Sequence, residues 1–190
     1  MAYLLVGNSK EMNSLDIFIQ NYFSMARTSF TTEFAYIVSR FFDVTDWEGA
    51  ITFMAMVFCI FILIYLFRNK KYSLLFLSTL FCGVIIIYFL KMFFGVARPL
   101  DGVIIAFGQS FPSYHATMAT MFFTMLMFIF DDYFNSLGRI IFNLACVVGI
   151  FLVAISRVYL GVHWLSDVIG GIVLGVLICF MATRVFKYFK

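Results

Sequence analysis

Long apolar runs dominate the pattern of hydrophobic and polar positions along this chain. Five of them have about the 20 mostly apolar residues that a bilayer-spanning helix needs, and short polar links separate them. They cover residues 50–67, 72–94, 112–130, 140–160 and 162–183. The runs are continuous rather than alternating, and in lipid only helices and closed barrels satisfy their backbone hydrogen bonds. The pattern therefore predicts an all-α, polytopic membrane helix bundle with five transmembrane helices, or six if part of the N-terminal region also spans.

Residues 1–49 contain no such run and show a different periodicity. Apolar residues recur there twice at helical spacing, which places one apolar stripe on each of two helices. The stripes are Leu15, Phe18, Ile19, Tyr22 and Phe23, then Phe34, Ile37, Val38, Phe41 and Phe42. The apolar start, residues 2–6, is shorter than the apolar core of about 7–15 residues in a signal peptide. We expect an amphipathic segment over 1–49 that lies in the membrane interface and a transmembrane core over 50–190.

Composition supports the membrane prediction. Hydrophobic residues make up 64% of the chain and charged residues 12%, whereas a soluble domain has about 25% charged residues. The aromatic share of 21% excludes disorder, and a net charge of +3 indicates no nucleic-acid partner. The four cysteines lie singly within apolar runs, so we interpret them as small buried side chains rather than disulfides or metal ligands.

Basic residues gather at one set of helix ends. That set is Arg68, Lys70, Lys71, Arg139, Arg184, Lys187 and Lys190. Outside the motifs described below, the opposite side has Lys10, Arg27 and Arg40. Because basic flanks favour the cytoplasm, we expect a multi-pass protein of the cytoplasmic (inner) membrane with a cytoplasmic C-terminus. The loop over residues 95–111 would then face the periplasm or the exterior.

Six ionisable residues lie in or beside the spans, near their predicted outer ends. They are Lys91, Arg98, His115, Arg157, His163 and Asp167. Each alone has an ordinary explanation, such as a lysine that extends its amine to the interface or an arginine at a helix C-terminus. Taken together they have no such explanation, because separate segments of the chain place ionisable residues at the same corner of the predicted bundle. Ionisable groups at membrane depth are costly and usually mark a functional site.

The spacing of these residues suggests phosphate chemistry. His163 and Asp167 are four residues apart on one helix face, so the carboxylate can accept the imidazole N–H and fix its tautomer. An arginine guanidinium can bind two oxygens of one phosphate in a bidentate manner, and a lysine ammonium adds a point charge. Pro112 fits the first turn of a helix. Ser113 and the free N–H groups at that helix start would form an anion site.

Three motifs carry a resemblance to a known family. They are K-x6-R-P from Lys91 to Pro99, P-S-x-H from Pro112 to His115, and S-R-x5-H-x3-D from Ser156 to Asp167. Together they resemble the signature blocks of the type 2 phosphatidic acid phosphatase family, which also includes bacterial acid phosphatases and vanadium haloperoxidases. The resemblance covers roughly residues 50–183. It is most similar to the membrane branch of bacterial phosphatidylglycerophosphate and undecaprenyl-pyrophosphate phosphatases.

The resemblance implies hydrolysis of a phosphomonoester or pyrophosphate through a phosphohistidine, with no metal or other cofactor. In that scheme His163 is the nucleophile, Asp167 orients it, and His115 protonates the leaving oxygen. The phosphate-binding set would be Lys91, Arg98, Arg157 and Ser113, with a backbone N–H near Tyr114. Two features depart from the family: Tyr114 stands where glycine is usual, and membrane members commonly have six spans. We hypothesise that Tyr114 narrows or redirects the headgroup pocket.

The predicted function is a membrane lipid phosphatase whose site faces outward, with a phosphorylated lipid as substrate and membrane lipids around it. Undecaprenyl pyrophosphate, phosphatidylglycerophosphate, phosphatidic acid and lipid A phosphates are all candidates, and the oligomeric state stays open. One alternative is a lipid phosphotransferase that uses the same phosphohistidine. A non-enzymatic anion transporter or channel is another, although the sequence shows no polar pathway across the spans. The soluble haloperoxidase branch fits the spans poorly.

Overall fold

The computed structural model describes residues 13–44 and 46–189, and within these ranges it contains seven helices and no strand. The helices are α1 (Ser14–Ala26), α2 (Ser29–Arg40), α3 (Trp47–Phe67), α4 (Lys70–Phe94), α5 (Tyr114–Phe130), α6 (Ser136–Tyr159) and α7 (Leu165–Tyr188). The predicted all-α bundle is thus confirmed. The part of the predicted N-terminal segment over 1–12 lies outside the described residues, as does Lys190 of the basic set.

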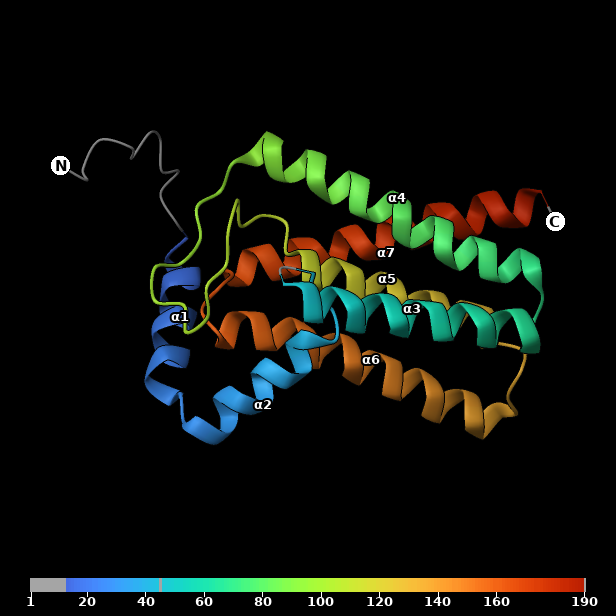
Figure 1. Ribbon diagram of the computed structural model, residues 1–190, viewed down its shortest axis with the longest axis horizontal. Coiled ribbons are helices and arrows are strands. Elements are labelled where there is room, and N and C mark those ends of the chain that lie inside the picture. Colours follow the sequence, from blue (N-terminus) through green and yellow to red (C-terminus); the bar gives the residue numbers. More distant parts are fainter. Residues whose placement is uncertain (1–12, 45, 190) are drawn as a thin grey trace.

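Helices α3 to α7 run side by side along the long axis of the molecule, while α1 crosses one end of the bundle (Figure 1). Each of the helices α3 to α7 corresponds to one of the five predicted spans. Four of them, α3, α4, α6 and α7, are long and apolar enough to cross a membrane. The fifth, α5, has 17 residues, a length of about 26 Å at 1.5 Å per residue. The chain is therefore a multi-pass membrane protein.

Helix α5 lies at the centre of the bundle and packs against α4, α6 and α7. Its contact with α7 is close because α7 presents two glycines. A Cβ on Gly171 would lie 2.9 Å from the carbonyl oxygen of Ser113, and one on Gly175 would lie 2.8 Å from the Cβ of Thr120. Small residues at such contacts let helix backbones approach in lipid. This contact holds the start of α7 against the start of α5.

An aromatic cluster joins the N-terminal helices to the bundle. Phe42, just after α2, is 2% exposed. Its ring centroid lies 5.8 Å from that of Phe53 on α3, and 5.6 Å and 6.0 Å from those of Phe122 and Phe123 on α5. Aromatic pairs at these separations add to the energy of burial. The link between α2 and α3 is thereby fixed against α5.

Both predicted amphipathic helices form, as α1 and α2, but the burial of α1 differs from a simple interfacial helix. Asp16 and Gln20 on its polar face are each 4% exposed, whereas Leu15, Phe18 and Tyr22 are more than half exposed. The polar face packs on the end of the bundle because it finds hydrogen-bond partners there. The exposed apolar side chains face outward, where lipid would surround them.

Candidate active site

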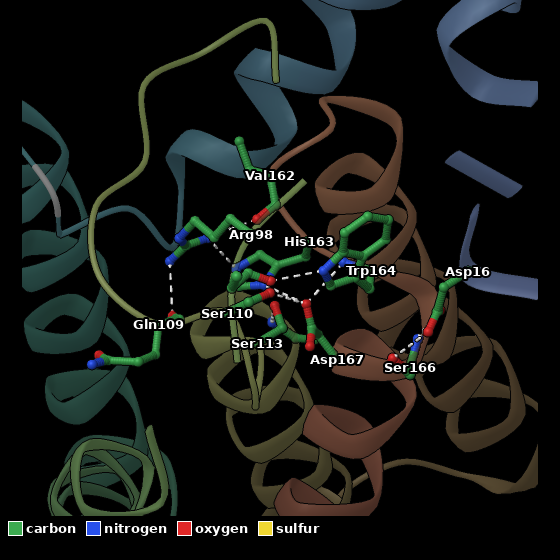
Figure 2. A network of polar contacts seen from close by, with 12 residues as sticks. Asp16, Arg98, Gln109, Ser110, Ser113, Val162, His163, Trp164, Ser166 and Asp167 are labelled. Atoms are coloured by element: carbon green, nitrogen blue, oxygen red, sulfur yellow. Dashed lines mark hydrogen bonds and ion pairs between the residues drawn. The ribbon is translucent and has the colours of Figure 1, made fainter. Parts of the chain in front are cut away.

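The predicted site residues meet at the end of the bundle that α1 crosses (Figure 1). There α4 and α6 end, α5 and α7 begin, and the loop over 95–113 folds back. Figure 2 shows the polar contacts around the start of α7. The basic residues that flank the spans, from Arg68 to Lys187, lie at the ends of the same helices that are far from this site.

The carboxylate of Asp167 holds the ring of His163. Nδ1 of His163 lies 3.3 Å from Oδ2 of Asp167, and each residue is 1% exposed. The same oxygen accepts the backbone N–H of Trp164 at 2.8 Å and the hydroxyl of Ser110 (Figure 2). An ionised carboxylate only accepts hydrogen bonds, so Nδ1 is the protonated nitrogen. The lone pair of His163 is therefore on Nε2.

A second carboxylate fixes the start of α7. Trp164, the N-cap residue, makes no side-chain cap. Instead Asp16 on α1 accepts the backbone N–H of Ser166 at 2.8 Å and its hydroxyl at 2.7 Å (Figure 2). The free N–H groups of a helix start need such acceptors. The backbone N–H of Ser113 also donates to the carbonyl of Asp167 at 3.1 Å, which ties α5 to α7.

Arg98 faces Nε2 of His163. Its Nη1 lies 3.1 Å from that nitrogen and donates to the carbonyl of Val162 at 2.7 Å. The remaining N–H groups donate to the carbonyls of Phe107, Gly108 and Gln109 at 3.1–3.3 Å. Gly108 has a φ of +73°, which lets the loop curl around the guanidinium. Because a guanidinium has donors only, its position agrees with a lone pair on Nε2.

Lys91, at the end of α4, binds the same stretch of loop. Its Nζ donates to the carbonyls of Gln109 at 2.7 Å and Ser110 at 3.1 Å. Two cations from different segments are thus held by consecutive carbonyls of one loop. A hollow of about 300 Å³ adjoins Arg98 and is also lined by Pro99, Gly161 and other residues of the two loops.

Arg157 and His115 lie on the inner side of the site, each 3% exposed. Nη1 of Arg157 donates to the hydroxyl of Ser39 at 2.7 Å. Nε2 of His115 lies 4.0 Å from Oδ1 of Asp43, and within the described residues it has no hydrogen-bond partner. His115 also interacts electrostatically with Arg157, His163, Arg98 and Lys91, in order of decreasing strength. The two histidines therefore share one electrostatic environment.

The second predicted motif has a slightly different local structure than its sequence suggested. Ser113 is the N-cap of α5 and accepts the N–H of Ala116 at 3.5 Å. Pro112 lies before this cap, so its predicted place in the first turn is wrong. The cause is the hydroxyl of Ser113, which can serve as a cap where proline cannot. Tyr114 is half-buried, and its ring packs edge-on against that of His115 with centroids 5.8 Å apart.

Burial and charge together favour a neutral imidazole at His163. Burial lowers the pKa of His163 well below its ordinary value of 6.5, and the charges of Arg157, Arg98 and Lys91 lower it further. Burial also lowers the pKa of Arg98, a shift that the charge of Asp167 opposes. A neutral imidazole with its lone pair beside a cation is arranged for attack on an electron-poor centre whose oxygens carry negative charge.

Several residues of this site carry no signal in the sequence motifs. They are Asp16, Ser39, Asp43 and Ser110. Three of the four come from the N-terminal segment. Asp16 and Ser39 lie more than 100 residues from their partners Ser166 and Arg157, and Asp43 lies 72 residues from His115. Spacing within a helix cannot reveal such partners. From sequence alone, a polar residue on an amphipathic helix is expected to face solvent even where the fold buries it. Within 13–44 and 46–189, no three His, Cys, Asp or Glu side chains are grouped to hold a metal ion.

Comparison with known proteins adds three findings. The model of the PAP2 superfamily matches residues 71–190. Phosphatidylglycerophosphatase B of Bacillus subtilis (strain 168) is 37% identical over 75 residues, which are 38% of this chain and 36% of that protein. The matched region thus spans about a third of that relative.

Two solved structures share the fold. One is the first transmembrane PAP2 type phosphatidylglycerolphosphate phosphatase from Bacillus subtilis, with a TM-score of 0.83 and 24% identity over 96% of this chain and 90% of that one. The other is LpxE from Aquifex aeolicus, with a TM-score of 0.74 and 20% identity over 93% and 99% of the two chains. At these identities the likeness concerns the fold.

Proposed function

Because this chain belongs to the PAP2 superfamily, we propose that it is an integral membrane lipid phosphatase that hydrolyses a phosphomonoester or pyrophosphate through a phosphohistidine. One observation carries the proposal: His163 is held through Nδ1 by Asp167 while its Nε2 faces Arg98 at 3.1 Å. A nucleophile, its orienting acid and a phosphate-binding cation thus adjoin one another. The names of the relatives, which are phosphatases of lipids, support the same reaction class.

The reaction proceeds in two displacements. In the first, the lone pair on Nε2 of His163 attacks phosphorus, the bond to the leaving oxygen breaks, and His115 gives that oxygen a proton. Asp167 balances the positive charge that develops on the ring of His163. In the second, His115 takes a proton from water, the water oxygen attacks phosphorus, and the P–N bond breaks. Phosphate leaves and both imidazoles return to their starting states.

The protein supplies the positive charge that phosphoryl transfer needs. Such reactions depend mainly on positioning and on neutralising the equatorial oxygens. Lys91, Arg98 and Arg157 meet this need as three cations, and the start of α5 at Ser113 adds a helix end that favours anions. The reaction is therefore proposed to be metal-independent.

The orientation in the membrane follows from the basic residues at the opposite end of the bundle. Because basic flanks stay in the cytoplasm, the site lies at the outer face of the cytoplasmic membrane and the C-terminus lies inside. At that depth the phosphate of a lipid headgroup reaches the histidines without leaving the interface. The substrate class is therefore a phosphorylated lipid.

Phosphate release from purified protein in detergent tests the function directly. The panel contains phosphatidylglycerophosphate, phosphatidic acid, undecaprenyl pyrophosphate and a lipid A phosphate. His163→Ala should lower kcat by at least about 10⁴-fold, the usual cost of removing a nucleophile. Ser78→Ala is the matched control, since its hydroxyl only donates to the carbonyl of Leu75 within α4. Vanadate should inhibit and EDTA should not.

The outcomes of this assay separate the alternatives. Absence of phosphate release from every lipid, together with anion flux through proteoliposomes, would favour a transporter. Appearance of the phosphoryl group on an added lipid or sugar acceptor would favour a phosphotransferase. Complete inhibition by EDTA would contradict the metal-independent mechanism.

Tyr114 is proposed to shape the headgroup pocket, because its half-buried ring lies against His115. Tyr114→Gly should change the ratio of kcat/KM values among the four lipids. Tyr114→Phe keeps the ring and serves as the control. Unchanged ratios in the glycine variant would refute this role.

A further inference from the structure

We propose that Asp43 is a positioning residue that favours the protonated form of His115 in the first displacement, an inference that rests on the proposed function. The acid that protonates the leaving oxygen has to carry a proton before the substrate reacts. Asp43 lies outside all three sequence motifs, in the link between α2 and α3, and is 7% exposed. Its Oδ1 lies 4.0 Å from Nε2 of His115.

The charges around His115 show why a carboxylate is needed. Lys91 on α4, Arg98 in the loop, Arg157 on α6 and His163 before α7 all act on this ring. Lys91, Arg98 and Arg157 are cations, and a positive charge on a buried ring among them is repelled. Asp167 is committed to His163, Trp164 and Ser110. Asp43 lies 4.0 Å from Nε2 of His115, and its negative charge also acts on Arg157 and Tyr114, so it offsets part of this repulsion.

The fold holds Asp43 in place by packing. Its neighbour Phe42 is anchored against Phe122 on α5, two helical turns beyond His115. The backbone N–H groups of Phe42 and Asp43 donate to Ser39 and Arg40, each at 3.1 Å. One rigid turn therefore sets the register of the carboxylate against the imidazole.

The absence of a side chain at Gly49 on α3 leaves space for the turn that carries Asp43. A Cβ at Gly49 would lie 3.0 Å from the Cβ of Asp43 and 3.1 Å from its carbonyl oxygen. Contacts that short require a shift of the backbone that carries Asp43. Gly49→Ala therefore displaces the carboxylate without removing it.

In the first displacement the proton passes from Nε2 of His115 to the leaving oxygen as the P–O bond breaks. Asp43 neither gives nor takes a proton in this step. Its effect should depend on the leaving group, because an alkoxide needs the proton whereas a nitrophenolate does not. A purely structural role would slow both kinds of substrate alike.

The test compares two substrates in the full-length protein in detergent. They are dioctanoyl phosphatidic acid, which has an alkyl leaving group, and a 4-nitrophenyl phosphate with an octyl chain on the ring. Asp43→Asn should lower kcat for the alkyl substrate about 10- to 100-fold, within the range of general acid catalysis, and leave kcat for the aryl substrate nearly unchanged. Asp46→Asn, which removes a charge from the same link and keeps an N-cap oxygen for Gly49, should change neither.

Two further variants keep the proposal testable if Asp43→Asn folds poorly. Gly49→Ala should show the same selective loss to a smaller extent. Asp43→Asn in a His115→Ala background should add nothing to the loss from His115→Ala alone. Equal losses on both substrates, or full additivity with His115→Ala, would overturn the role of Asp43. A wild-type protein that hydrolyses neither substrate would instead refute the proposed function.

Discussion

At the scale of single residues, one oxygen organises the candidate nucleophile. Oδ2 of Asp167 accepts hydrogen bonds from Ser110, Trp164 and His163, while Oδ1 is buried and has no hydrogen-bond partner within the described residues. Hydrogen bonds to a buried charge contribute more than neutral ones. The orientation of His163 therefore depends on a side-chain donor, Ser110, that lies in none of the three motifs.

Removal of this donor should slow the reaction without weakening binding. Ser110→Ala leaves Asp167 with two donors, and a hydrogen bond to a charged group is worth about 1.5–3 kcal/mol. We expect kcat to fall about 10- to 100-fold with little change in KM, measured by phosphate release from the preferred lipid. A wild-type kcat in Ser110→Ala would show that the hydroxyl does not hold Asp167 in the working enzyme.

The lowered pKa of His163 links protonation to stability. Because the folded state keeps this ring neutral, the unfolded chain binds more protons below the ordinary pKa of 6.5. The contribution of His163 is therefore complete above that pH and is lost as the pH falls through it. The melting temperature in detergent should drop between about pH 7.5 and about pH 5.5, and the drop should be smaller in His163→Asn. An identical drop in both proteins would contradict this account.

At the scale of elements, α1 and the segment after it hold the candidate site together. Asp16 binds the start of α7, and Gln20 binds Asp101 of the loop at 2.9 Å and 3.1 Å. Arg27 donates to the carbonyl of Asp101 at 2.9 Å and to the carbonyl of Tyr159, the last residue of α6, at 3.0 Å. One helix thus fastens three segments that carry site residues.

The sequence predicted these elements more completely than their contacts. The sequence predicts all five helices of the bundle, because lipid-facing helices leave long apolar runs, and it predicts both amphipathic helices from their periodicity. Four of the five bundle helices are long enough to span a membrane, and α5 is shorter. The convergence of the histidines could be predicted because the site residues alternate between the end of one helix and the start of the next, namely Lys91 near the end of α4, His115 at the start of α5, Arg157 near the end of α6 and His163 just before α7. The burial of Asp16 and Gln20 could not be predicted, because the polar face of a helix is expected to contact solvent unless its packing partner is known.

Loss of the hydrogen bonds between Asp16 and the start of α7 should destabilise the protein. Asp16→Ala removes two hydrogen bonds from Ser166, and loss of a helix cap costs about 1 kcal/mol. We expect a melting temperature several degrees lower in detergent, while Asp16→Asn retains an acceptor and should lose less. Equal melting temperatures for wild type and Asp16→Ala would mean that α1 does not anchor α7.

At the scale of the whole molecule, charge divides the bundle into two unlike ends. The candidate site occupies one end, and the other has ion pairs at its surface, namely Arg68 with Asp132 and Arg139 with Asp131. A groove of about 1050 Å³ between α4 and α7 lies toward this second end. Its lining is almost wholly apolar, which suits acyl chains rather than phosphate.

The division predicts a single orientation in the membrane. With the basic end inside, a fluorescent protein fused to the C-terminus should fold in the cytoplasm and fluoresce. Alkaline phosphatase at the same position should stay inactive, because it matures only outside. The reverse pattern would place the histidines in the cytoplasm and remove the outer leaflet as the source of substrate.

The hydrogen bonds of Arg98 determine how the proposed reaction begins. Every N–H of this guanidinium faces an atom of the protein: four carbonyl oxygens and the ring nitrogen of His163. An incoming headgroup therefore competes with neutral acceptors that already sit where its own oxygens must go. We expect a doubly charged phosphate to win that exchange and to free Nε2 of His163, whereas an uncharged or zwitterionic lipid of the surrounding bilayer should not. We therefore expect electrostatic competition at Arg98 to contribute to selection against uncharged and zwitterionic lipids.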